Sequence, residues 1–207
     1  MRVLVCDDHS LFREGLRLLL ESLDADLQVT LAASAEEAVA KAQSATYDLV
    51  LMDWHMDGGM GGAAALEALR ESAPLSRVVV LSGDRDVELV RTAVELGAAG
   101  FIPKDSAPAV LMQAVMRVAE GGVYLPTAGV TRVTPRDVRD AFPQLTERQA
   151  DVLRAALRGS SNKLIARELG ISDGTVKTHL RAIYQELGTR NRTEAVYMAA
   201  EQGVRIS

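Results

Sequence analysis

Residues 49–53 read Leu49-Val50-Leu51-Met52-Asp53, four consecutive apolar side chains that end in a carboxylate. A continuous apolar run is typical of a strand that is buried on both faces of a parallel sheet. Four further short runs lie on either side of it in the sequence, at residues 3–6, 27–31, 78–81 and 100–102. Segments with helical spacing of apolar residues separate the runs. The first 120 residues therefore predict five βα units.

Apolar residues at helical spacing indicate helices between the runs. One apolar set consists of Leu11, Gly15, Leu18 and Leu19, and a second of Leu89, Val90, Ala93, Val94 and Leu96. The last helix of this half is expected over residues 106–120. Alternating strands and helices with right-handed crossovers predict a doubly wound α/β domain, with a five-stranded parallel sheet between helices.

The charge of the chain is unevenly distributed. The 207 residues carry a net charge of −5, but residues 1–125 hold 10 basic and 19 acidic side chains, a net −9. Residues 126–207 hold 13 basic and 9 acidic side chains, a net +4. Such asymmetry favours two domains with different partners, one of them a polyanion, although chance variation would also produce it.

The composition excludes several classes of protein. With 48% hydrophobic and 25% charged residues, the chain is globular rather than disordered. The apolar runs are too short for a membrane-spanning helix, and the N-terminus reaches charged residues too early for a secretory signal. The single cysteine, Cys6, precludes an internal disulfide, and three scattered histidines match no zinc pattern. We expect a soluble cytoplasmic protein with no membrane partner.

The pattern changes after residue 120. Residues 121–143 contain Gly, Pro and Thr without a long apolar period, which favours a linker with a short helix near residues 135–141. Residues 144–207 are helical throughout in pattern. The second of these helices is expected to end at Gly170. The predicted N-caps of the four helices are Thr146 (in a capping box with Gln149), Ser161, Ser172 and Thr193. The predicted domains are thus residues 1–120 and 144–207, joined by 121–143.

Polar side chains follow four of the five predicted strands. Asp7 and Asp8 follow the first strand and Asp53 the third, while Ser82 and Lys104 follow the fourth and fifth. The carboxyl ends of parallel strands meet at one edge, where clustered carboxylates suit Mg²⁺. A carboxylate can also attack phosphorus, and a lysine and a hydroxyl can contact the phosphoryl oxygens.

The histidines beside these carboxylates are a weaker candidate for metal ligands. His9 and His55 lie near the predicted strand ends, but no paired histidine or cysteine accompanies either side chain. We therefore expect both side chains to have hydrogen-bonding or surface roles.

The third helix of the C-terminal half has two distinct sides. One side carries the apolar stripe Val176, Leu180, Ile183 and Leu187, and the opposite side carries Lys177, Thr178, Arg181 and Gln185. A short helix and a Gly-Ile-Ser turn before it predict a helix-turn-helix that enters the DNA major groove. Basic residues such as Lys163, Arg167 and Arg192 would neutralise phosphates. An ordinary helical bundle with a solvated charged face is the alternative.

The stretches VLVCDDHSLFREGL, DLVLMDWHMDG, VVVLSGD and GAAGFIPKD resemble a response-regulator receiver domain, which has a flavodoxin-like fold. This resemblance implies that Asp53 is the phosphoacceptor. It further implies that Asp8, Asp53 and the backbone carbonyl of His55 bind Mg²⁺, with Asp7 doing so through water. The remaining implied roles are the switch hydroxyl for Ser82, the phosphate-binding lysine for Lys104 and the switch aromatic for Phe101. A plain core role for Phe101 is the alternative.

The sequence departs from the receiver pattern in one loop. Receivers of this kind usually read Met-Pro-Gly, but here Met56 is followed by Asp57 and Gly58. Asp57 adds a carboxylate and removes the rigid proline, while the glycines nearby loosen the loop. We expect this change to affect metal affinity and phosphoryl lifetime, whereas the assignment of Asp53 stands.

The stretch from Leu145 to Val196 resembles a LuxR-type DNA-binding domain, an all-α unit of four helices. The resemblance implies groove contacts by Lys177, Thr178 and Arg181. The residues expected near the DNA backbone are Lys163, His179 and Asn191. Departures are Leu164, where an acidic residue is usual, and Gln185-Glu186, where a basic residue often occurs. The last helix, 193–202, is similar to the family's dimerisation helix, with packing against its own domain as the alternative.

Together the two resemblances imply a response regulator of the NarL/FixJ type. A histidine kinase would phosphorylate Asp53, and the phosphorylated protein would bind double-stranded DNA as a homodimer, without being an enzyme beyond its own phosphoryl chemistry. A DNA-binding regulator with a degenerate receiver is one alternative. A phosphatase with an aspartyl-phosphate intermediate is another, but it would need an acid/base carboxylate at the position that His55 occupies.

Overall fold

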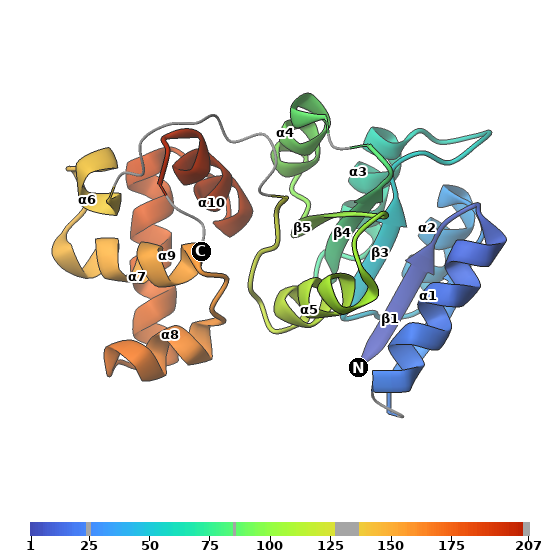
Figure 1. The fold of residues 1–207 in the computed structure, drawn as a ribbon, viewed down its shortest axis with the longest axis horizontal. Coiled ribbons are helices and arrows are strands. Elements are labelled where there is room, and N and C mark those ends of the chain that lie inside the picture. Colours follow the sequence, from blue (N-terminus) through green and yellow to red (C-terminus); the bar gives the residue numbers. More distant parts are fainter. Residues whose placement is uncertain (24–25, 85, 127–136, 205–207) are drawn as a thin grey trace. The chain divides into compact units, whose positions relative to one another are not determined.

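The structure, a computed structural model, describes residues 1–23, 26–84, 86–126 and 137–204 (Figure 1). The chain divides into two compact units, Met1–Val115 and Met116–Ser207. None of the helices in the described ranges combines the length and the apolar character that crossing a bilayer requires.

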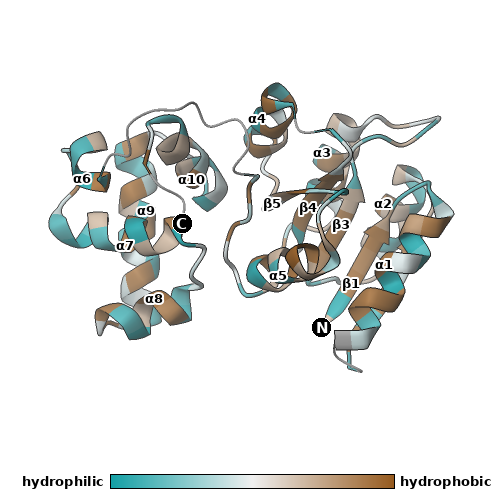
Figure 2. Cartoon of the chain, in the orientation of Figure 1, coloured by the Kyte–Doolittle hydropathy of each residue, from teal (hydrophilic) through white to brown (hydrophobic). Residues whose placement is uncertain are grey.

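A five-stranded parallel sheet forms the centre of the first unit, as predicted. Its strands are β1 (Arg2–Cys6), β2 (Gln28–Ala32), β3 (Leu49–Asp53), β4 (Arg77–Ser82) and β5 (Gly100–Pro103). They are ordered β2-β1-β3-β4-β5, and every neighbouring pair is parallel. All of β3 and β5 is buried, and most of β1 and β4, which accounts for their continuous apolar runs. Figure 2 shows this hydrophobic character along the strands.

Five helices accompany the sheet. They are α1 (Ser10–Leu23), α2 (Ala35–Ser44), α3 (Gly62–Ser72), α4 (Val87–Glu95) and α5 (Pro108–Ala119). Helix α2 packs beside α3, and α3 beside α4. The step from β1 to β2 runs opposite to the later steps across the sheet, so right-handed crossovers put α1 on the face opposite α2, α3 and α4.

Helix α1 is present, but the apolar set that indicated it in the sequence is not its buried side. Leu11 and Leu18 are 87% and 59% exposed, whereas Leu16 and Leu20 are buried against the sheet. Leu16 and Leu20 are spaced i, i+4, and Leu11 and Leu18 are spaced i, i+7, so both pairs fit a helical period. Because α1 carries apolar residues around most of its circumference, periodicity alone did not identify the buried side.

The second unit is helical. Its helices after the end of α5 are α6 (Val138–Ala141), α7 (Glu147–Leu157), α8 (Asn162–Leu169), α9 (Asp173–Leu187) and α10 (Arg192–Glu201). Helix α9 packs against α7 and α8, and the predicted stripe on α9 is buried. Helix α6 covers the end of the short helix expected near 135–141, of which residues 135 and 136 lie outside the described ranges.

Three of the four predicted caps are present. Thr146 forms the capping box with Gln149, and the side chains of Ser161 and Ser172 accept from backbone N–H groups in the first turns of α8 and α9. Gly170 ends α8 in the left-handed conformation, at φ 64°. The fourth prediction is wrong, because Asn191 caps α10 and Thr193 is buried inside its first turn. Both residue types are good caps, so the sequence alone did not show which of the two would cap the helix.

Candidate functional site

A cluster of carboxylates lies where the strand order reverses, at the carboxyl ends of β1 and β3. Doubly wound sheets open a crevice at this point, because the chain leaves the two adjacent strands toward opposite faces. Asp7 and Asp8 directly follow β1, and Asp53 is the last residue of β3. Asp7 and Asp53 are 0% and 1% exposed, while Asp8 is partly exposed. The predicted acidic cluster is therefore assembled, with two of its carboxylates out of water.

Lys104 forms ion pairs with both buried carboxylates. Its Nζ lies 2.7 Å from Oδ2 of Asp53 and 2.7 Å from Oδ2 of Asp7. Burial lowers the pKa of the Lys104 ammonium, but bonds to the two carboxylates outweigh this and hold the pKa above its ordinary value. Burial raises the pKa of Asp53, and the ammonium offsets only part of that rise. In this pocket the Asp53 carboxylate is therefore paired with the Lys104 ammonium.

Asp8 is held by different partners. Its Oδ1 lies 2.8 Å from Nδ1 of His9, and its Oδ2 accepts the backbone N–H of Asp57 at 2.7 Å. Desolvation works to raise the pKa of Asp8, but these hydrogen bonds outweigh it and lower the pKa. The backbone N–H of His9 also donates to Oδ1 of Asp7, at 2.9 Å.

The donor set fits a divalent cation. One ligand atom from each of Asp7, Asp8, His9 and Asp53 lies within 4.8 Å of the others. Three carboxylates supply the hard oxygen ligands that Mg²⁺ prefers. The His9 side chain, expected to have only a hydrogen-bonding or surface role, is within reach of the same point.

The other predicted residues of the first unit surround Asp53. The backbone N–H of His55 donates to Oδ1 of Asp53 at 3.1 Å. The Ser82 side chain is buried and its hydroxyl accepts the N–H of Asp84 at 3.0 Å. Phe101 lies fully buried on β5, paired with Val80, as a core residue would.

The strand ends border an open cavity of about 630 Å³. It is lined by His9, Leu11, Phe12, Asp53, His55, Gly83, Asp84 and Lys104. Phe12 places its ring centroid 4.8 Å from Nζ of Lys104. Sequence reasoning missed Leu11 and Phe12 as lining residues, although their position just after Asp8, at the start of α1, is the signal that would have found them.

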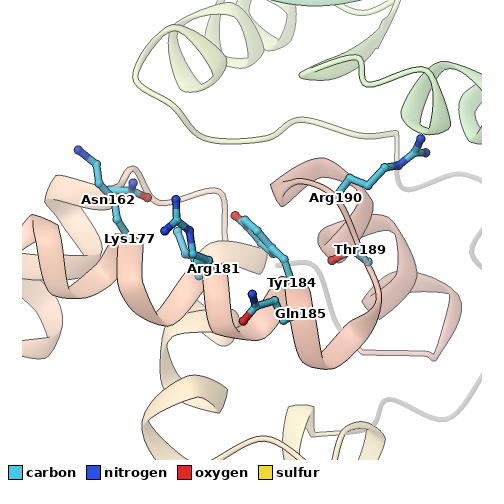
Figure 3. A pocket seen from close by; sticks show the side chains of 8 residues that line it. Asn162, Lys177, Arg181, Tyr184, Gln185, Thr189 and Arg190 are labelled. Carbon is cyan, nitrogen blue, oxygen red and sulfur yellow. The ribbon is translucent and has the colours of Figure 1, made fainter.

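The polar side of α9 is exposed, as the pattern of charges predicted. Lys177, Thr178 and Arg181 are all exposed, opposite the buried stripe. Figure 3 shows Lys177, Arg181 and Tyr184 projecting from the same side of α9, beside a hollow of about 440 Å³. The Lys177 ammonium forms an ion pair with Asp173 at 2.8 Å, and the Thr178 hydroxyl donates to the Gly174 carbonyl at 3.1 Å.

The remaining candidates for DNA contacts differ in their surroundings. Lys163 is exposed on α8, His179 is partly buried, and the Asn191 side chain caps α10. Arg192, predicted to neutralise phosphates, instead donates to the carbonyl oxygens of Ala156 and Ser160. A side chain bound in this way is not free for a phosphate, so that prediction is wrong.

The apolar residues of α10 are also in use, because they pack inside the second unit. The four residues Ala195, Val196, Ala199 and Ala200 are all buried within the second unit. This is the packing against its own domain that was the alternative to a dimerisation surface. The partly exposed positions on this helix include Tyr197 and Met198.

Comparison with known proteins assigns both units. Residues 3–116 match the response regulator receiver domain, and residues 143–199 match the bacterial regulatory proteins of the luxR family. The transcriptional regulatory protein YdfI of Bacillus subtilis (strain 168) is 34% identical, across 98% of this chain and 97% of its own. The nitrate/nitrite response regulator protein NarP of Escherichia coli (strain K12) is 34% identical, across 97% and 95%.

A solved structure agrees with these relatives. The crystal structure of a LuxR family DNA-binding response regulator from Silicibacter pomeroyi has a TM-score of 0.54 and 37% identity, covering 61% of this chain and 97% of that one. Such proteins combine two parts. One is a receiver domain with an acidic pocket at its strand ends, and the other is a helix-turn-helix unit. The chain therefore belongs to the response regulators that join a receiver domain to a LuxR-type DNA-binding domain.

Proposed function

We propose that this response regulator acts in the cytoplasm as a switch for transcription, in which a histidine kinase phosphorylates Asp53 in a Mg²⁺-dependent step. The phosphoryl group on Asp53 would then control sequence-specific binding to double-stranded DNA. One observation carries the proposal. The Asp53 carboxylate is 1% exposed and paired with Lys104, yet it lines an open cavity that a phosphodonor can enter.

The residues of the pocket have distinct roles in this proposal. Asp8, Asp53 and the backbone carbonyl of His55 would hold Mg²⁺, with Asp7 acting through water. When bound, the cation would offset the negative charge of the phosphoryl oxygens. Burial raises the pKa of Asp53 and the Lys104 ammonium opposes that rise, which favours the ionised carboxylate that the reaction needs as its nucleophile.

Signal transmission would begin at the same atoms. A phosphoryl group adds roughly −1.5 to −2 charges, which must be balanced by new contacts. Ser82, which is buried, ends β4, and Lys104 directly follows β5, so a hydroxyl and an ammonium stand at these strand ends. Movement of Ser82 toward the phosphoryl oxygens would open space for Phe101, which packs on the neighbouring strand. This coupling would bias DNA binding or dimer formation.

The DNA-binding step would use α9 in the major groove. Lys177, Thr178 and Arg181 would contact base edges, and Lys163, His179 and Asn191 would lie near the phosphates. A homodimer would read two half-sites about 34–36 Å apart. The exposure of the three α9 side chains on one face supports this step.

The alternative function is DNA binding without phosphorylation. It is favoured by Asp57, which stands where receivers of this kind usually have proline and whose N–H occupies an oxygen of Asp8. In that case the acidic pocket would serve as a structural cation site, and Asp53 would remain unmodified.

The test is labelling by a small acyl phosphate donor in the presence of Mg²⁺. Wild-type protein and the control variant Asp84→Asn, which removes another carboxylate of the same cavity, should both be labelled. Asp53→Asn should not be labelled. DNA affinity measured on the same samples should change on labelling, and only where Asp53 is present. Equal labelling of all three proteins would contradict the assignment, and DNA binding indifferent to labelling would favour the alternative.

A further inference from the structure

The loop that follows β3 is fastened at two points by backbone N–H groups that donate to carboxylates. The N–H of Asp57 donates to Oδ2 of Asp8, and the N–H of Met60 donates to Oε1 of Glu36, each at 2.7 Å. The two partners come from different parts of the chain, since Asp8 follows β1 and Glu36 lies in the first turn of α2. The loop is therefore fixed to the sheet edge and to a helix.

Glycine is required for the second of these attachments. Gly59 adopts a φ of 101°, and a Cβ built on it would collide with the Glu36 carboxylate. The glycine-rich stretch that looks loose in sequence thus lets the backbone approach Glu36 closely enough to bond to it. The hydrogen bonds to Glu36, from its own backbone N–H and then from Met60, lower its pKa and keep it ionised as an acceptor.

Asp8 depends on this loop more than the other two carboxylates do. Asp7 and Asp53 have side chains that are 0% and 2% exposed and that pair with Lys104. The Asp8 side chain is 19% exposed, and the ion pairs that Lys104 makes in the described part of the chain are with Asp7 and Asp53, not with Asp8. Its two oxygens face His9 Nδ1 and the Asp57 N–H. Because the His9 side chain is 70% exposed, the backbone donor is the firmer of the two restraints.

We propose that Asp57 is a positioning residue for the divalent-cation site, acting through its backbone N–H, which orients the Asp8 carboxylate toward the cation. The proposal rests on the metal site of the proposed function. A proline at this position has no N–H and cannot make the bond. The Asp57 carboxylate is not among the clustered ligand atoms, so the backbone donor, and not the added negative charge, is the part that acts. Hydrogen bonds of this kind orient metal ligands and tune affinity.

The test separates the N–H from the side chain. Asp57→Ala removes the carboxylate and keeps the N–H, whereas Asp57→Pro removes both. The dissociation constant for Mg²⁺ is measured by calorimetric titration of the full chain, without any phosphodonor. We expect Asp57→Pro to weaken Mg²⁺ binding about 10-fold, a typical effect of losing a partner that orients a metal ligand. Asp57→Ala should remain within about 2-fold of wild type.

A second pair of variants tests the other attachment and guards against misfolding of the proline variant. Glu36→Ala removes the acceptor for Met60, and Glu36→Gln retains an acceptor oxygen. We expect Glu36→Ala to weaken Mg²⁺ binding by a smaller factor, about 3-fold, and Glu36→Gln to resemble wild type. Circular dichroism and thermal unfolding without Mg²⁺ report whether each variant is folded.

Several outcomes would overturn the proposal. Equal weakening by Asp57→Ala and Asp57→Pro would assign the effect to charge, and tighter binding by Asp57→Pro would mean that the N–H competes with the cation. Absence of Mg²⁺ binding by wild type would remove the site itself. Failure of the proposed function gives a different result, because Asp53 would then stay unlabelled while the Mg²⁺ affinities of the variants still differed as expected.

Discussion

The strand-end pocket of the first unit and the helical core of the second each hold a cation partly out of water, and they do so differently. Lys104 lies between the carboxylates of Asp7 and Asp53. Arg192 donates to the carbonyl oxygens of Ala156 and Ser160, and in the described part of the chain no carboxylate forms an ion pair with it. The pKa of Lys104 is accordingly raised by its acidic partners, whereas burial lowers the pKa of Arg192.

The difference in partners distinguishes a candidate functional cation, Lys104, from a structural one, Arg192. Two carboxylates and an ammonium would be able to exchange partners if a metal ion or a phosphoryl group bound, because each of them can form a new ion pair. The carbonyl oxygens that Arg192 contacts at the end of α7 and in the turn before α8 are fixed by the backbone and carry no net charge. We therefore expect changes at Lys104 to alter chemistry and changes at Arg192 to alter stability.

The largest effect should come from Lys104→Met. Without the ammonium, Asp7 and Asp53 lose their shared partner, and a phosphoryl group on Asp53 would lose a donor. We expect the rate of Asp53 labelling by an acyl phosphate to fall about 100-fold or more, as is usual when a preorganised donor is removed. Lys41→Met, on α2 and away from the cavity, should label at the wild-type rate. An unchanged rate in Lys104→Met would remove the distinction between the two cations.

Arg192→Met should lower the free energy of unfolding by about 2–4 kcal/mol, because several carbonyl groups lose their donor in a partly buried position. Urea unfolding of the full chain measures this, and the loss should be the same with and without Mg²⁺. Arg190→Met removes a neighbouring arginine whose side chain is 71% exposed and should cost about 0.5 kcal/mol or less. Weakened DNA binding by a fully stable Arg192→Met protein would restore the role in phosphate contact that the sequence suggested.

Asp53→Asn should stabilise the receiver at pH 7 in the absence of Mg²⁺. Burial raises the pKa of Asp53 in the folded state above its unfolded value. Between these two values the folded state binds more protons, so stability falls as pH rises through that window. Asparagine does not titrate. The variant should therefore be the more stable protein at neutral pH, and the gap should close as the pH falls below the folded pKa of Asp53. A gap that widened in acid would contradict the sign of the shift.

The sequence was informative where local patterns are sufficient. The strands, the Thr146 cap and the alignment of Asp7 and Asp53 at one sheet edge follow from apolar runs, hydroxyl positions and parallel topology. The sequence was uninformative where the role of a residue depends on which groups tertiary packing brings next to it. Arginine has the same sequence signature whether it faces a phosphate or the carbonyl oxygens that Arg192 meets.

The loop after β3 shows a second limit of the same kind. A backbone N–H is present at every residue except proline, so nothing in the amino-acid sequence identifies the N–H of Asp57 as the donor to Asp8. The sequence did mark the position as unusual, but through the carboxylate that Asp57 adds rather than through the hydrogen bond that it allows. Main-chain donors become visible only when the fold brings their acceptors beside them.

The smallest effect we expect concerns a cation of a third kind, Lys177, which is paired with Asp173 on the exposed surface of α9. Their side chains are 66% and 41% exposed, so the ion pair is weak and an approaching phosphate or base edge can replace the carboxylate. Asp173→Asn frees Lys177 and removes a negative charge from α9, which should tighten DNA binding about 2-fold to 5-fold at moderate salt.

The matched measurement repeats the substitution in a Lys177→Ala background, with DNA affinity followed as salt is raised. If the gain in affinity comes from releasing Lys177, Asp173→Asn should have little effect once that lysine is absent. A gain that persisted in Lys177→Ala would mean that Asp173 acts on DNA directly by repulsion. Lys177 would then resemble Arg192, a cation engaged within its own domain, rather than Lys104, whose partners can be exchanged for a ligand.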